Sequence, residues 1–296
     1  MAKNTIGFIG LGIMGNPMAR CLGKKFPGIL AYDADPKKVK AAVSDTVKAA
    51  ESIRQIGESC SAVFLSLPST AAVRSVILGE DALVSAMKKG SVIIDTGTTE
   101  AGAEKEIAGI LKEKGIKYLD APVSGGEKAA IEGSLSFMVG GDEEVFKACR
   151  KYFLAMGASA VRTGDISMGQ VAKCVNQIIV GSTFMAIAES FALGTKAGLD
   201  PKVLYDAIKG GWAGSKLLDV AAKDMFSRSF KPGGTVDIHW KDLGYALSVS
   251  QDLDVPAPIT ALVHEAFKAA RAAGDGKRSQ PALVRLWERL LSIEVK

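Results

Sequence analysis

The feature that most constrains how this chain can fold is a glycine-rich stretch near its start, Gly10-Leu11-Gly12-Ile13-Met14-Gly15. An apolar run, residues 6–9, precedes it, and a helix-like segment opens at Asn16-Pro17. Between a strand and a helix, a G-x-G-x-x-G loop predicts a dinucleotide-binding turn. Its glycines allow a tight turn, close approach of the backbone to a pyrophosphate, and close packing of helix on strand. The helix start adds unpaired N–H groups and a positive dipole end.

An acidic residue, Asp33, ends the next apolar run, about 20 residues beyond the loop. Such a carboxylate accepts hydrogen bonds from the adenosine ribose hydroxyls and repels a 2′-phosphate. No arginine follows it directly, since the next residues are Ala34-Asp35-Pro36. The loop and the acid together favour NAD over NADP, and a surface turn with two aspartates is the alternative.

Composition narrows the classes of function. The 296 residues are enough for two domains, and 48% apolar with 23% charged residues is a globular composition. The net charge of +5 comes from scattered residues, so it does not predict nucleic-acid binding, although it suits an anionic substrate. Without a signal peptide or an apolar run of membrane-spanning length, we expect a cytoplasmic protein that binds no membrane.

Cysteine and histidine usage predicts neither a disulfide framework nor a metal site. The cysteines show no C-x-x-C spacing, and several are expected to be buried as small apolar residues. With two histidines in the chain, a His-based metal site is not expected. The residues in question are Cys21, Cys60, Cys149, Cys174, His239 and His264.

The order of apolar and amphipathic segments predicts two domains. Short apolar strands alternate with helical stretches such as 36–43 and 101–114 in the first half, which is typical of a parallel sheet covered by helices. We therefore predict an α/β Rossmann-type doubly wound sheet over residues 1–165 and an all-α domain over residues 166–296. The expected strands are 6–9, 29–32, 62–67, 92–95, 118–119, 135–139 and 159–162.

The second half is predicted to be helical throughout. The run 171–196 is apolar on more than one side, which is typical of a buried helix at the centre of a domain or between domains. This apolar half also suggests extra buried surface in a homo-dimer or homo-tetramer. Further helices are expected at 201–208, 217–225, 240–253, 259–273 and 281–291.

Turns rich in hydroxyl groups and glycine follow three of the predicted strands. Ligands of open α/β sheets bind beyond the carboxyl ends of the strands, so these turns are candidate contacts for a cofactor and a small acid. In the last turn, the Ser124 hydroxyl and the N–H groups around Gly125 and Gly126 are suited to a carboxylate. An ordinary Pro/Ser/Gly turn is the alternative. The three turns are 68–70, 96–99 and 120–126.

Lys173 is the candidate acid/base. It lies early in the apolar run, and desolvation among apolar neighbours lowers the pKa of a lysine. Asn176 lies one helical turn away and Gln177 nearly so, and either could orient a substrate. The alternative is a lysine that extends to the surface from a helix end.

Two further segments are weaker candidates. In Trp240-Lys241-Asp242, a cation and an anion at a helix start could reach a cofactor, but from the residues alone a surface ion pair is favoured. Trp212 lies in a glycine-rich stretch, 210–215, where it could limit substrate size or belong to the core.

Taken together and in order, these segments resemble the β-hydroxyacid dehydrogenase family, whose members include 3-hydroxyisobutyrate dehydrogenase and tartronate semialdehyde reductase. The resemblance implies that Lys173 is the acid/base and that the Ser124 turn holds the substrate carboxylate. It also implies cofactor contacts by Leu67, Pro68, Thr98 and Lys241, which reverses the preference for a surface pair. The matching segments are residues 10–15, 120–133, 169–176 and 241–244.

Departures from the family pattern affect the substrate more than the reaction. Gln177 stands where a second asparagine is common, Gly97 where a serine is common, and Ser167 where a glycine is common. Asp33-Ala34 does not fit the Asn-Arg of NADP-using relatives. The expected function is NAD-dependent oxidation of a small 3-hydroxy acid. Alternatives are an NADPH-linked semialdehyde reductase, an imine reductase, which the presence of Lys173 disfavours, and a non-catalytic cofactor-binding scaffold.

Overall fold

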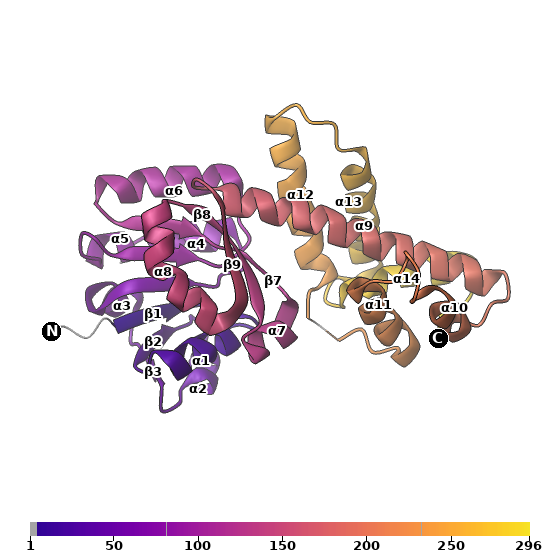
Figure 1. The fold of residues 1–296 in the computed structure, drawn as a ribbon, viewed down its shortest axis with the longest axis horizontal. Coiled ribbons are helices and arrows are strands. Elements are labelled where there is room, and N and C mark those ends of the chain that lie inside the picture. Colours follow the sequence, from indigo (N-terminus) through magenta and orange to yellow (C-terminus); the bar gives the residue numbers. More distant parts are fainter. Residues whose placement is uncertain (1–4, 81, 232) are drawn as a thin grey trace. The chain divides into compact units, whose positions relative to one another are not determined.

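The computed structural model describes residues 5–80, 82–231 and 233–296 (Figure 1). The chain divides into two compact units, Met1–Lys173 and Cys174–Lys296. The domain boundary predicted after residue 165 falls just before the helix that begins at Met168, and it stays a prediction.

A nine-stranded sheet forms the centre of the first unit, in the order β3-β2-β1-β4-β5-β6-β8-β7, with β9 paired to β8. Strands β1 to β6 are parallel, whereas β8 is antiparallel to β6 and β7. The strand order reverses between β1 and β4, and ligands of doubly wound sheets bind at such a switch point. The strands are β1 Thr5–Ile9, β2 Ile29–Tyr32, β3 Val47–Ala49, β4 Cys60–Leu65, β5 Val92–Asp95, β6 Lys117–Asp120, β7 Val123–Ser124, β8 Leu135–Gly141 and β9 Gly157–Gly164.

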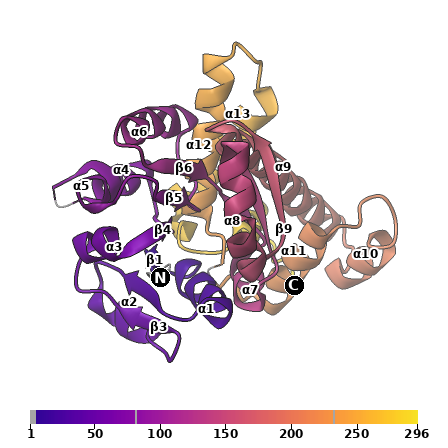
Figure 2. The ribbon, with the colours of Figure 1, turned by 60° about the vertical axis from the view of Figure 1, so that its left-hand side comes forward.

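Helices cover both faces of this sheet, as the sequence predicted. Side chains alternate between the faces of a strand, so Phe64 of β4 packs into one apolar cluster while Val63 and Leu65 pack into the other. In Figure 2, α3 to α6 lie on one side of the sheet and α1, α7 and α8 on the other. The helices are α1 Gly15–Lys25, α2 Pro36–Ala42, α3 Ile53–Ser59, α4 Thr70–Leu78, α5 Leu83–Ala86, α6 Ala101–Glu113, α7 Gly126–Glu132 and α8 Glu143–Met156.

The described part of the second unit consists of helices and turns, apart from one isolated bridge between Thr235 and Ser279. Helix α9, Met168–Lys196, begins in the first unit and continues into the second, whose core includes Phe191, Leu243 and Phe267. The other elements are α10 Pro201–Ile208, α11 Lys216–Ser227, α12 Val236–Asp252, α13 Pro258–Ala270, a π-helical turn Arg271–Asp275, a 3-10 turn Gln280–Leu283 and α14 Val284–Leu291.

Two expectations about α9 were wrong. The helix is long and apolar enough to cross a membrane by length and composition, with a mean hydropathy of 1.5 over its most apolar window. This is weak support for a membrane span, because the core helices of water-soluble proteins pass the same test. The helix is also less buried than its apolar pattern predicted, since Val175, Ile179 and Leu193 are exposed.

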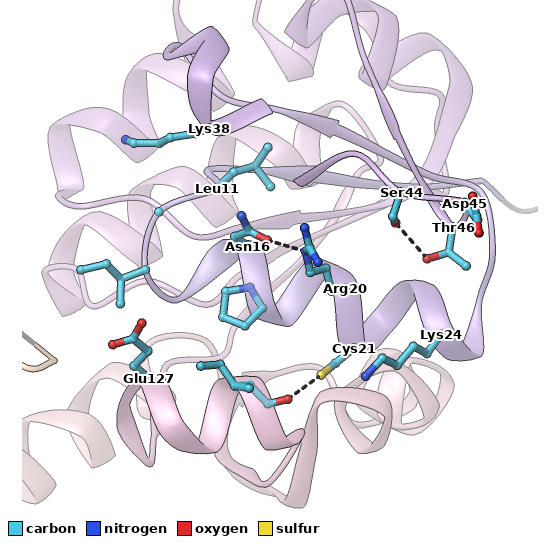
Figure 3. Close-up of a pocket in the computed structure, with 14 residues that line it drawn as sticks. Leu11, Asn16, Arg20, Cys21, Lys24, Lys38, Ser44, Asp45, Thr46 and Glu127 are labelled. Carbon is cyan, nitrogen blue, oxygen red and sulfur yellow. Dashed lines mark hydrogen bonds between the residues drawn. The ribbon is translucent and has the colours of Figure 1, made fainter. Parts of the chain in front are cut away.

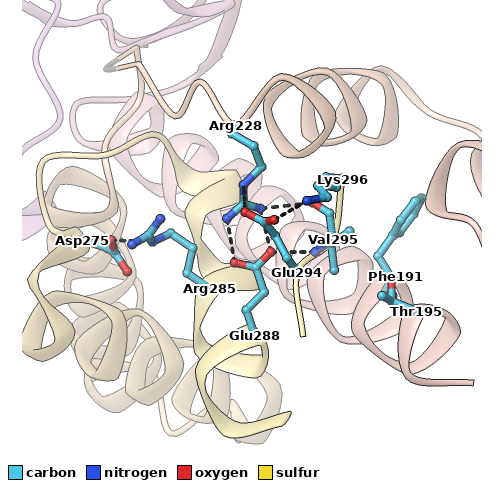
Figure 4. A network of polar contacts seen from close by, with 9 residues as sticks. All are labelled: Phe191, Thr195, Arg228, Asp275, Arg285, Glu288, Glu294, Val295 and Lys296. Atoms are coloured by element: carbon cyan, nitrogen blue, oxygen red, sulfur yellow. Dashed lines mark hydrogen bonds and ion pairs between the residues drawn. The ribbon is translucent and has the colours of Figure 1, made fainter. Parts of the chain in front are cut away.

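Ion pairs hold the end of the chain to the second unit (Figure 4). Arg228 donates to both carboxylate oxygens of Glu288, at 2.6 and 2.9 Å, and to the backbone oxygen of Val295 at 3.1 Å. Glu288 in turn accepts the backbone N–H of Val295 at 2.9 Å. The apolar side chain of Val295 is fully buried, so this network fixes the residues after α14.

Candidate active site

The glycine loop has the geometry that its three glycines predict. Gly10 has a φ of +94°, and a Cβ there would lie 2.3 Å from the backbone oxygen of Ser66. A Cβ on Gly15 would lie 1.9 Å from the backbone oxygen of Gly10. A Cβ on Gly12 would meet nothing within 4 Å. Gly10 and Gly15 are therefore required by the fold, whereas the space over Gly12 is open to a ligand.

The start of helix α1 is suited to phosphate groups. Met14 at the N-cap makes no side-chain capping bond, and the first turn contains no acidic residue. The first N–H groups of a helix have no partner within the helix, and the dipole favours negative charge there. The loop and the helix start thus fit the pyrophosphate of a dinucleotide.

Asp33, the residue after β2, is hydrogen-bonded to this loop. One carboxylate oxygen accepts the backbone N–H of Leu11 at 2.7 Å. The other accepts the backbone N–H of Asp35 at 2.9 Å and lies 3.7 Å from the ammonium of Lys38. This is the expected position for a ribose-binding acid beside the loop. Its contact with the cofactor stays a prediction.

A pocket of about 850 Å³ opens beside the loop (Figure 3). Leu11, Gly12 and Ile13 line one end, and helix α1 contributes Arg20 and Lys24 along its length. Neither Asp33 nor the turns after β4 and β5 line it, so it covers only the loop end of the predicted cofactor site.

The turns after β4 and β5 lie close together, because these parallel neighbours end at the same sheet edge. A Cβ on Gly97 would lie 3.0 Å from the backbone oxygen of Leu67, so glycine lets the two turns approach. Leu67, Pro68 and the half-buried Thr98 thereby share one edge of the sheet, as predicted. Their contacts with a cofactor stay predictions.

The predicted carboxylate turn and Lys173 meet in the structure. The Nζ atom of Lys173 donates to the backbone oxygen of Val123 at 2.9 Å, next to Ser124. Gly125 and Gly126 have φ values of +133° and +69°, and a Cβ on Gly126 would meet nothing within 4 Å. An amine, a hydroxyl and an open stretch of backbone are thus combined, which suits proton transfer beside a small carboxylate.

Two residues that the sequence analysis did not single out hold the first turn of α9. Asp120, which ends β6, accepts the backbone N–H of Ser167 at 2.7 Å and that of Gln170 at 2.9 Å. The side chain of Gln170 is bonded to the turn after β5. A carboxylate directly after an apolar strand was the available signal for Asp120, whereas nothing in the sequence distinguished Gln170 from an exposed helical residue.

Asp120 belongs to a buried acidic group at this sheet edge. Burial, reinforced by the nearby Glu104, raises the pKa of Asp120 to about 7, while the N–H groups of Ser167 and Gln170 oppose the shift. Burial also raises the pKa of Glu104, which accepts the hydroxyl of Thr99. Burial likewise raises the pKa of Tyr118. Burial thus favours the protonated forms of these neighbouring side chains.

The remaining predicted residues lie in the second unit. Gln177 is buried, and its amide donates to Asp242 at 2.7 Å, while Asp242 lies 3.2 Å from the ammonium of Lys241. Asn176 donates to the side-chain oxygen of Gln177 at 2.9 Å. Gln177 thus contacts Asp242, which in turn contacts Lys241. Roles for Asn176, Gln177 and Lys241 toward a ligand stay predictions.

Trp212 is fully exposed in the turn between α10 and α11, so a place in the core is ruled out. Its effect on substrate size stays a prediction. All four cysteines are buried, where several were expected to be.

Comparisons with known proteins agree with this arrangement. Residues 5–174 match the NAD binding domain of 6-phosphogluconate dehydrogenase, and residues 167–287 match the NAD-binding domain of NADP-dependent 3-hydroxyisobutyrate dehydrogenase. The chain is 38% identical to 2-hydroxy-3-oxopropionate reductase of Escherichia coli, over 96% of this chain and 97% of that one. It is 35% identical to 2-(hydroxymethyl)glutarate dehydrogenase of Eubacterium barkeri, over 98% and 97%. The crystal structure of 3-hydroxyisobutyrate dehydrogenase from Salmonella typhimurium superposes with a TM-score of 0.87 at 28% identity, over 95% and 99%.

Fold and site together define a dinucleotide-dependent oxidoreductase. The chain belongs to the β-hydroxyacid dehydrogenase family, and it catalyses NAD(P)-dependent oxidoreduction of hydroxy acids.

Proposed function

We propose that this enzyme interconverts a 2-substituted 3-hydroxypropanoate and its semialdehyde, with NAD as the preferred cofactor and Lys173 as the acid/base. The names of the three relatives imply a shared chemistry: each substrate carries a primary alcohol or an aldehyde on the carbon next to the one that bears the carboxylate. They differ in the group on C2. We therefore propose that the group on C2 distinguishes one substrate from another, while the reaction stays the same.

The observation that carries the proposal is the 2.9 Å contact between the Nζ atom of Lys173 and the backbone oxygen of Val123. It keeps the amine next to Ser124, where the substrate carboxylate would bind with the N–H groups of Gly125 and Gly126. Lys173 then accepts the proton of the C3 hydroxyl as the alcohol is oxidised, and it returns the proton in the reverse direction. Bound NAD⁺ supplies the hydride acceptor, so alcohol and NAD⁺ give semialdehyde, NADH and a proton.

The preference for NAD rests on Asp33. Its carboxylate is fixed by the N–H of Leu11, so it cannot easily turn away from a 2′-phosphate. Lys38 lies 3.7 Å from the same carboxylate, which leaves an NADPH-linked semialdehyde reductase as the second candidate.

We also propose a homo-dimer or homo-tetramer. The exposed apolar side chains of Val175, Ile179 and Leu193 on α9 support it, because apolar surface on a helix is stabilised by burial against another surface. Light scattering coupled to gel filtration measures the molar mass; a monomer at micromolar concentration would contradict the proposal.

The activity is tested by supplying 3-hydroxypropanoates with methyl, hydroxyl, amino or carboxyethyl groups on C2, each with NAD⁺ and with NADP⁺, and following absorbance of the reduced cofactor. One of them should be oxidised with NAD⁺ at least tenfold more efficiently than 3-hydroxybutanoate, whose alcohol is secondary. Equal rates with the secondary alcohol would refute the substrate class.

Lys173→Ala tests the mechanism. Turnover should fall by about 10²–10⁴-fold, the usual contribution of an acid/base, while the dissociation constant for NADH changes little. Lys196→Ala, at the other end of the same helix, is the matched control and should keep its activity. Near-normal turnover of Lys173→Ala would remove this residue from the mechanism.

A further inference from the structure

The side-chain amide of Gln170 brackets Thr98. Its Nε2 atom donates to the backbone oxygen of Gly97 at 3.0 Å, and its Oε1 atom accepts the backbone N–H of Thr99 at 3.2 Å. The amide therefore bonds to one backbone group before Thr98 and to one after it, and it fixes the backbone on both sides of that residue. The side chain is fully buried, so no water competes for either bond. The backbone of the turn after β5 is therefore fixed by a residue of α9.

The backbone of Gln170 is held by a different element, strand β6. Its N–H donates to Asp120 at 2.9 Å, while the N–H of Ser167 reaches the other oxygen of that carboxylate at 2.7 Å. The packing here is tight, since a Cβ on Gly169 would lie 2.6 Å from the backbone oxygen of Asp120. One helical turn further, Lys173 bonds to Val123. Gln170 thus joins the turn that carries Thr98 to the helix turn that carries Lys173.

We propose that Gln170 is a positioning residue that holds Thr98, on the cofactor side, and Lys173, on the substrate side, in one fixed geometry. This inference rests on the proposed function, because it assumes that Lys173 is the acid/base. A rigid frame between hydride acceptor and proton acceptor matters because misplacement by about 1 Å can cost about 10²-fold in rate. Gln170 touches neither reacting atom, and it acts through the two residues it holds.

The replacement Gln170→Glu separates this role from simple packing. A protonated glutamic acid can still donate to Gly97 and accept from Thr99, whereas the ionised carboxylate cannot donate. Three carboxyl groups bond to this turn and to the helix start: Asp95 to the N–H of Gly97, Glu104 to the hydroxyl of Thr99 and Asp120 to the N–H of residue 170. The cations of this region are Lys173, one helical turn away, and Arg74, which acts on Glu104. Like charges and burial favour the protonated form of the introduced carboxyl. Function should therefore be restored as the pH falls.

The first experiment measures kcat and KM of Gln170→Glu relative to the unmodified enzyme from pH 5.5 to 9, with Gln251→Glu, an exposed helical site, as control. We expect kcat of Gln170→Glu to lie within threefold of the unmodified enzyme at the acidic end. It should fall at least thirtyfold below it at the basic end, with KM changed less than threefold. A kcat ratio that does not vary with pH would overturn the proposal.

The second experiment uses Gln170→Met, which keeps the length of the side chain and removes both bonds. Hydrogen exchange followed by mass spectrometry on the segment containing Thr99 should be at least tenfold faster than in the unmodified protein. Because exchange needs no turnover, this result stands even if the variant is inactive. Unchanged protection would show that Gln170 does not hold the turn.

A double-mutant comparison separates the two proposals. Gln170→Met should lower kcat at least thirtyfold when Lys173 is present, and by at most a few-fold in the Lys173→Ala background, where only the displacement of Thr98 still acts. A thirtyfold loss in both backgrounds would overturn positioning through Lys173. High activity of Lys173→Ala alone would instead refute the proposed function.

Discussion

The carboxylate of Asp120 accepts the backbone N–H of Gln170 at 2.9 Å, which connects the last residue of β6 to the first turn of α9. This acid works as a helix cap supplied by a distant strand and is buried at the sheet edge. Burial and the nearby Glu104 raise its pKa to about 7, so it titrates close to physiological pH. The bond that holds the first turn of α9 is therefore sensitive to pH.

Asp120 should make the folded state less stable as the pH rises from about 4 to about 7. In this window the folded protein keeps a proton that the unfolded chain, with an ordinary pKa of 3.8, has released. The free energy of unfolding then falls with rising pH, by at most about 1.4 kcal/mol per pH unit for one group. Asp120→Asn cannot ionise, so its stability should fall less steeply.

Urea unfolding at mildly acidic and at mildly basic pH measures this difference. Between the two conditions, Asp120→Asn should gain on the order of 2 kcal/mol relative to the unmodified protein. The control is Asp165→Asn, because Asp165 is exposed and pairs with Arg162 at the surface. Identical pH dependence in Asp120→Asn and the unmodified protein would show that Asp120 ionises normally.

Two glycines of the loop, Gly12 and Gly15, should respond differently to alanine. Gly15→Ala forces a Cβ to within 1.9 Å of the backbone oxygen of Gly10, so it should lower the melting temperature by several degrees or abolish folding. Gly12→Ala meets nothing within 4 Å, so it should fold normally and yet bind NADH at least tenfold more weakly, since its methyl group occupies the approach to the pyrophosphate. Calorimetry and NADH fluorescence titration measure the two effects. Normal cofactor affinity in Gly12→Ala would place the pyrophosphate elsewhere.

Asp33 should determine the choice between the two cofactors. Asp33→Asn combined with Ala34→Arg removes the repulsion of a 2′-phosphate and adds a cation to bind it. The ratio of kcat/KM for NADP⁺ to that for NAD⁺ should rise by at least about 10²-fold. The control, Asp35→Asn, keeps a good N-cap for α2 and should leave the ratio unchanged. A starting preference for NADP⁺ would contradict the role given to Asp33.

Arg228 should stabilise the second unit through Glu288. Arg228→Met leaves the largely buried carboxylate of Glu288 without its bidentate partner and removes a bond to the residues that follow α14. We expect a loss of about 2 kcal/mol, less than the 3–5 kcal/mol of a fully buried pair because Arg228 is partly exposed. Lys147→Met removes exposed ion pairs on α8, which solvent screens, so it should leave the denaturant midpoint nearly unchanged. Denaturant unfolding measures both variants. Equal losses of stability would show that the burial of Glu288 does not strengthen its ion pair.

The strands and helices with a local signal were predictable from the sequence. Strand β2 and helix α10 begin and end at the predicted residues, because an apolar run between breakers and an Asp-Pro start define them locally. The short strands β3 and β7 were missed, since a strand of two or three residues has no recognisable period and forms only because a partner strand is already in place.

The sequence by itself determined the glycine loop, the acid at the end of β2 and the position of Lys173 near the start of a helix. Each depends on residues that are neighbours along the chain, so composition and spacing are sufficient. Only the tertiary structure decided that Asp120 caps that helix and that Gln170 reaches across to Gly97 and Thr99. These bonds join residues some 50 to 70 positions apart, and their strength comes from burial, which a linear pattern of residues does not record.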